Sequence, residues 1–185
     1  MPSFSFLVIN NISCKLQLCC ELKMIIMHFG TSNTGIRTIP VCVAWYNTDT
    51  KKGAYYVIRP SDYWEHDGIS TGCKPTREDC LKYGLSTSCV SRKLNEQLNG
   101  MVVYTENPIN TKDCIEKIYG SCGDYPTYTV ENLSDFIPNK NFASYIHACA
   151  ILSNALKCNN ALGYVYALSG VVKIHSNLDV DKAEN

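Results

Sequence analysis

Two histidines and two acids are the side chains of this chain best suited to bind a metal or to move a proton. His28 follows the apolar run that opens MIIMHFGTSNTG (24–35), and such a run is typical of a buried strand delivering side chains to a site at its end. Glu106 and Asp113 come after a second apolar run, and His147 lies in HACAIL. Imidazole and carboxylate groups serve as metal ligands and as general acids or bases, so they predict a catalytic or metal site.

Ordinary structural roles explain the same residues equally well. His28 can be a polar residue at a strand end, and His147 a hydrogen-bonded histidine on an apolar helix face. Glu106 can be a loop carboxylate that caps the next helix. Asp113 can sit in the first turn of a helix, where the helix dipole favours an acid. A site with a softer metal, formed by His28, Glu106 and His147, is a further alternative.

The elements that must position these side chains form a mixed α/β pattern. Three apolar, β-branched segments near the start predict an antiparallel meander, at residues 24–30, 39–47 and 53–60. Residues 100–107 predict a fully buried strand, and 125–133 contain a short extended piece. Helices are predicted at 75–84 (N-cap Thr76), 86–100, 110–120 (beginning at Asn110 or Thr111), 139–158 and 160–172. This order implies a mixed five-stranded sheet with helices on both faces.

The size and charge of the chain suit one domain with no obligatory partner class. It has 185 residues and a formal net charge of zero, which neither demands nor excludes nucleic acid. We expect a single domain over 24–172, an extension over 1–23 that the fold does not need, and a polar tail over 173–185. No run approaches the roughly 18 apolar residues of a membrane span, so no membrane association is expected.

Eleven cysteines are scattered without C-x-x-C spacing, so a zinc site is not indicated. Their number is odd, and several lie inside apolar runs, such as Cys42 and Cys149. Reduced, buried thiols in an intracellular, cytoplasmic protein are therefore the favoured interpretation, with a disulfide-rich secreted fold as the alternative.

Several sequence segments, taken in their order along the chain, resemble segments of the DEDD-type 3′–5′ exonucleases, which have the ribonuclease-H-like fold. The likeness spans roughly residues 24–170 and is most specific over 40–107, where VCVAWYN, YYVIRPSDYW and HDGIS resemble family segments. The family's first motif is a strand ending in Asp-x-Glu-Thr, followed by a Ser/Thr-Gly turn. Here His28 stands at the aspartate and Gly30 at the glutamate, while Thr31 and Gly35 are retained.

The resemblance implies two Mg²⁺ or Mn²⁺ ions held by carboxylates, with a histidine as general base. His147 matches that histidine, but Leu152 stands at its acidic partner, and the second acidic position falls near Thr111. Glu106 and Asp113 are the nearest remaining acids, and with His28 they form the weak metal-ligand set; Glu106 and His147 are the catalytic candidates. Since each lost catalytic group removes several powers of ten in rate, little or no nuclease activity is expected, and no cofactor unless the protein is active.

Three functions from different classes follow from these residues. The first is an exonuclease-like protein that binds single-stranded nucleic acid or 3′ ends without cutting; Thr31, Arg37, Lys112 and Lys117 are its substrate-binding candidates. The second is an active exonuclease with atypical ligands that uses Mg²⁺ or Mn²⁺. The third is a non-catalytic interaction module with an exposed apolar patch. The sequence leaves the oligomeric state open.

Overall fold

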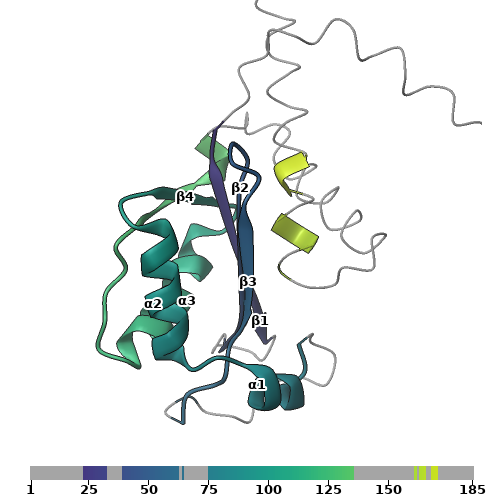
Figure 1. The fold of residues 1–185 in the computed structure, drawn as a ribbon, viewed down its shortest axis with the longest axis vertical. Helices are drawn as coiled ribbons and strands as arrows, with labels where there is room; N and C mark the ends of the chain where they lie inside the picture. The colour runs from purple at the N-terminus through teal and green to yellow at the C-terminus, as the bar shows by residue number, and fades with distance from the viewer. Residues whose placement is uncertain are drawn as a thin grey trace, which may run out of the picture.

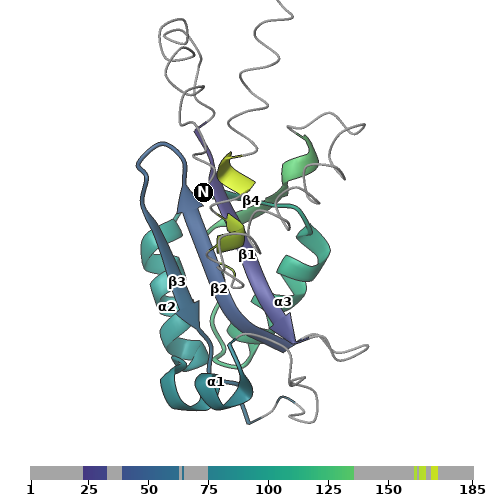
Figure 2. The same ribbon diagram turned by 90° about the vertical axis from the view of Figure 1, so that its right-hand side faces the viewer.

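The computed structural model describes residues 23–32, 39–62, 64, 75–135, 161, 163–165 and 168–170. Its centre is a five-stranded sheet in the order β3-β2-β1-β4-β5, visible in Figures 1 and 2. The strands are β1 (Ile25–Ser32), β2 (Ile39–Asn47), β3 (Gly53–Val57), β4 (Val102–Thr105) and β5 (Thr129–Asn132). The helices are α1 (Arg77–Tyr83), α2 (Thr87–Leu98) and α3 (Pro108–Gly120), with a short 3-10 turn at Leu133–Asp135. The predicted mixed α/β, ribonuclease-H-like sheet is confirmed.

The first three strands form the predicted antiparallel meander, and β1 is the central strand of the whole sheet. Met27 lies opposite Trp45 and His28 opposite Ala44, while β4 joins the other edge of β1 in parallel and β5 joins β4 in parallel. A strand flanked on both sides and covered on both faces is apolar nearly throughout, which explains the run that opens the sequence motif.

Three strand predictions need correction. The first strand does not break at Gly30 but continues to Ser32, because a register shift between Gly30 and Thr31 absorbs the irregularity. The third strand ends at Val57, before the proline that we expected to close it. The fourth is shorter and not fully buried: its alternating burial leaves Val102 40% exposed near the sheet's rim.

The helix starts follow capping chemistry. Thr76 forms a capping box with Asp79 and Ser86 accepts from the Cys89 amide, so the predicted starts of α1 and α2 are confirmed. The structure corrects the predicted start of α3 at Asn110 or Thr111, because the helix begins at Pro108. The Asn107 side chain caps it by accepting from the Asn110 amide. Pro108 fits the first turn, where the N–H that proline lacks would have no acceptor within the helix. Asp113 consequently lies beyond the first turn, and the dipole role expected for it does not hold.

The core has one cluster on each face of the sheet. Residues of α2 and α3, including Leu94, Leu98 and Ile118, pack against Met27, Phe29 and Val43 on one face. On the other face, Ala161, Val165 and Leu168 pack against Ile26 and Cys42. These last three residues lie in the helical segments that Figure 1 draws in yellow, on the opposite side of the sheet from α2 and α3.

Several predicted segments lie outside the described residues. They are residues 1–22 of the extension, the helix over 139–158 and the polar tail over 173–185. Within the described part of the chain, no helix has both the length and the apolar character needed to cross a lipid bilayer.

Candidate functional site

His28 and Glu106, which are 78 positions apart in the sequence, meet in the fold. Ile26 of β1 lies beside Tyr104 of β4 in parallel register, and continuing that register by two residues places His28 beside Glu106. The His28 Nδ1 atom is 2.6 Å from the Glu106 Oε1 atom, and the two side chains are 24% and 12% exposed. The middle of β1 and the carboxyl end of β4 therefore bring together a histidine and an acid, so the interpretation of His28 as a residue at a strand end is wrong.

Each member of the pair has a further contact. The second carboxylate oxygen of Glu106 accepts a 3.4 Å bond from the Thr105 hydroxyl, whose oxygen is also 2.9 Å from that of Thr111. Tyr164 stacks on the His28 ring at 4.3 Å between ring centres. An ionised carboxylate only accepts hydrogen bonds, so the His28 Nδ1 atom carries the proton of this contact. When the imidazole is neutral, its Nε2 atom keeps the lone pair.

Gly30, two residues along the same strand, contributes no side chain and has little room for one. A Cβ atom at this position would lie 2.5 Å from the sulfur of Cys42, which is fully buried on the neighbouring strand, and 4.0 Å from the Cβ of Ala161. Packing has therefore filled the space where a glutamate stem would begin.

These residues do not fit a pair of magnesium ions. Mg²⁺ is bound by oxygen ligands, chiefly carboxylates, in near-octahedral geometry. Here one carboxylate is hydrogen-bonded to an imidazole, Gly30 supplies no donor, and the buried side chain of Thr111 offers a hydroxyl. Within the described residues, no three His, Cys, Asp or Glu side chains converge as a metal-binding group. The predicted set of His28, Glu106 and Asp113 is therefore not assembled.

The other predicted site residues lie elsewhere or outside the described part. Asp113 and Lys117 line one hollow beside α3 together with Trp64, and Lys112 lines a second one between α3 and β5. Thr31 is half-buried at the penultimate position of β1, next to the register shift. Arg37, His147 and Leu152 fall outside the described residues.

Two residues that shape this site were not predicted from the sequence. Cys42 blocks the space at Gly30, and Tyr164 stacks on His28. The apolar run of β2 is a signal that Cys42 is buried, but only the register of β2 against β1 sets Cys42 opposite Gly30.

The described cysteines are buried or half-buried, and none of them forms a disulfide with another described residue. Burial raises the pKa of the Cys80 and Cys114 thiols to about 12 in each case. Burial also raises the pKa of Tyr55, and the neighbouring Cys42 thiol adds to this shift. These groups are therefore neutral at physiological pH and act as packing rather than as nucleophiles.

Comparison with known proteins identifies the fold. No protein-family model and no curated protein matches the chain. Among solved structures, it is similar to Escherichia coli exonuclease I in complex with a dT13 oligonucleotide, with a TM-score of 0.57 and 12% identity over 86% of this chain and 43% of that one. A complex of that enzyme with dA16 gives a TM-score of 0.55 at 12% identity, covering 88% of this chain and 44% of that one.

A zinc-bound form of the E. coli exonuclease I–single-stranded DNA complex is also similar, with a TM-score of 0.53 and 12% identity over 82% of this chain and 39% of that one. The chain thus spans about two-fifths of the length of these structures. At such low identity the likeness establishes the fold, which is the one that the sequence motifs indicated.

Proposed function

We propose that this chain binds single-stranded nucleic acid through an exonuclease-type fold and has lost most or all metal-dependent nuclease activity. The observation that carries the proposal is the hydrogen bond between His28 and Glu106. It joins an imidazole of β1 to the carboxylate that follows β4, and within the described residues no further acid joins them in a metal-binding group, whereas a two-metal nuclease needs several free carboxylates. The likeness to structures of exonuclease I bound to oligonucleotides supports the nucleic-acid part.

The loss of activity follows from charge. Two divalent ions beside a scissile phosphate need carboxylates to hold them, and an imidazole offers one nitrogen that Mg²⁺ binds poorly. The hydrogen bond to His28 also occupies one of the two carboxylate oxygens of Glu106. Losing several ligands removes many powers of ten in rate, since each is worth several powers of ten alone.

A paired nuclease and binding assay on the full chain tests the proposed function. We expect fluorescein-labelled 20-nucleotide single strands to bind with a salt-dependent affinity, as phosphate contacts require. We also expect no nucleotide release with Mg²⁺ or Mn²⁺. Release of nucleotides from the 3′ end by the unaltered protein would show an active enzyme with atypical ligands. Absence of both binding and cleavage would favour a protein-interaction module.

A variant with restored ligands is the matched control. His28→Asp, Gly30→Glu and Leu152→Asp restore acids at three of the motif positions, and Cys42→Ala must accompany them because its sulfur occupies the space of a Cβ at position 30. The same variant without Cys42→Ala tests whether this packing blocks recovery. Metal-dependent cleavage gained only in the variant with Cys42→Ala would show that the cleft is preserved and that its chemistry was removed.

A further inference from the structure

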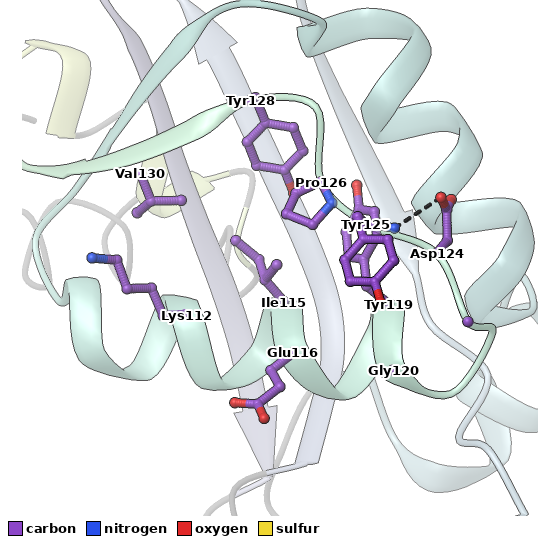
Figure 3. A pocket seen from close by; sticks show the side chains of 11 residues that line it. Lys112, Ile115, Glu116, Tyr119, Gly120, Asp124, Tyr125, Pro126, Tyr128 and Val130 are labelled. Atoms are coloured by element: carbon purple, nitrogen blue, oxygen red, sulfur yellow. Dashed lines mark hydrogen bonds between the residues drawn. The ribbon is translucent and has the colours of Figure 1, made fainter.

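A groove between α3 and β5 lies apart from the candidate site. Its volume is about 540 Å³, which is within the range of ligand pockets, and Figure 3 shows it from close by. Ile115 points from α3 toward Tyr128, across the groove (Figure 3). The α3–β5 groove is lined by Lys112, Ile115, Glu116, Tyr119, Gly120, Gly123, Asp124, Tyr125, Pro126, Tyr128 and Val130.

One wall of the groove is an open sheet edge. β5 is the last strand of the sheet, and no strand in the described part of the chain pairs with its outer side. Toward β4, the Thr127 carbonyl accepts from the Gly100 amide at 2.8 Å and the Thr129 amide donates to the Met101 carbonyl at 3.0 Å. Because these directions alternate along a strand, the backbone amides and carbonyls of Tyr128 and Val130 point outward.

The side chains beside that edge form an apolar surface. Tyr128 and Val130 pack on the α3 side of the sheet, with the core cluster that contains Ile115 and Tyr119. A strand added beside Val130 would direct every second side chain onto the same face, between β5 and α3. Tyr125, which is 81% exposed, extends this apolar surface at the far end.

The two ends of the groove carry opposite charges. In Figure 3, Lys112 lies beside Val130 at one end, and Asp124 lies beside Tyr125 at the other. No ion pair within the described residues joins either of them to a partner. Glu116, which projects from the opposite side of α3 to Ile115, adds a second acid to the lining, so the groove has no net positive charge to favour a phosphate backbone.

We infer that the α3–β5 groove binds an extended peptide of a partner protein, which adds to β5 as a sixth strand. Its backbone pairs with the outward groups of Tyr128 and Val130, and an apolar side chain fills the space near Ile115. An acidic residue of the peptide faces Lys112 and a basic residue faces Asp124, because this order matches the charges at the two ends. The inference goes beyond the proposed function and does not depend on it.

The test uses random ten-residue peptides displayed on phage and selected on the full chain. Synthetic copies of the enriched peptides are then measured by fluorescence anisotropy. We expect alternating apolar residues flanked by opposite charges, and at least tenfold weaker binding to Val130→Pro, which removes an outward amide but no bond to β4. Val130→Ile, which keeps the amide, is the matched control and should bind like the unaltered chain. Lys112→Glu should weaken binding of the same peptides.

A second measurement does not depend on the folding of any variant. N-methylation of alternate peptide amides blocks backbone pairing while leaving side chains intact, and we expect it to abolish binding in one of the two registers. Enriched peptides that tolerate methylation in both registers, or no enrichment at all, would overturn the inference. A dimer of the full chain that Val130→Pro converts to monomers would also overturn it, because the occupant would then be a second copy of the chain. Oligonucleotide binding that Val130→Pro weakens would overturn it too, because the occupant would then be a nucleic acid.

Discussion

At the scale of single residues, the most informative contact is the one that a Gly30 side chain would make. Any Cβ there meets the Cys42 sulfur at 2.5 Å, a distance that forces the thiol or the strand to move. Restoring the family's acid is therefore a packing problem as well as a chemical one. A change of one residue cannot rebuild the motif without disturbing a fully buried neighbour.

We expect Gly30→Ala to destabilise the fold by about 1–3 kcal/mol, the usual effect of overpacking a core. The loss should be smaller in a Cys42→Ala background, since the sulfur is then absent, and urea unfolding of the four members of this cycle measures the difference. Gly120→Ala is the control, because a Cβ there meets nothing within 4 Å. An equal loss in both backgrounds would show that the sulfur is not the obstacle.

At the scale of elements, one side chain of α2 forms hydrogen bonds to both walls of the α3–β5 groove. The Asn95 Oδ1 atom accepts from the Tyr119 hydroxyl at 2.8 Å and from the Thr127 amide at 3.0 Å, and its Nδ2 atom donates to the Tyr125 carbonyl at 2.9 Å. These bonds connect α2, α3 and the segment that leads into β5. The groove therefore depends on a residue that does not line it.

We expect Asn95→Ala to cost about 1–3 kcal/mol of stability because it removes three hydrogen bonds, each of which contributes about 0.5–1.5 kcal/mol. Thermal unfolding measures the loss, and faster amide exchange at Thr127 would locate it in the groove segment. Glu96→Ala, at a solvent-exposed site whose nearest cation is Arg92 at 3.9 Å, serves as the control and should change stability by less than about 1 kcal/mol. Equal effects of the two changes would contradict the role of Asn95.

At the scale of the whole molecule, the buried thiols link stability to alkaline pH. The Cys80 thiol donates to the Val41 carbonyl at 3.7 Å, and burial raises its pKa from 9.0 to about 12, as it does for Cys114. A group whose pKa is higher in the folded state than in the unfolded state makes its full contribution to stability at pH values below the unfolded-state pKa. This contribution is lost as pH rises through the folded value, because only the unfolded chain releases the proton readily.

Stability of the reduced protein should therefore fall progressively between about pH 9 and pH 12, measured as the urea midpoint at each pH. Cys114→Ala should flatten this dependence. Cys89→Ala should leave it unchanged, since Cys89 is only half-buried near the start of α2. A pH profile with the same slope in both variants would show that Cys114 does not carry the effect.

Local chemistry determined much of the fold from the sequence alone. The residues of β2 follow from their β-branched and aromatic composition. The capping box of Thr76 and Asp79 and the serine start of α2 follow from capping, which involves neighbours in the chain. The order of these elements also predicted the mixed sheet. The strand predictions were wrong where contacts between distant parts of the chain set the outcome. Examples are the end of β1, which lies beyond the register shift after Gly30, and the exposure of Val102.

The tertiary structure alone decided how the site residues combine. The sequence grouped His28, Glu106 and Asp113 as a weak metal-ligand set, but only the register of β1 against β4 joins the first two and leaves Asp113 in another hollow. Likewise, only the register of β1 against β2 sets Cys42 opposite Gly30. A one-residue slip in either pairing would turn these side chains to the other face of the sheet. Register depends on the packing of every strand together, and no local pattern in the chain records it.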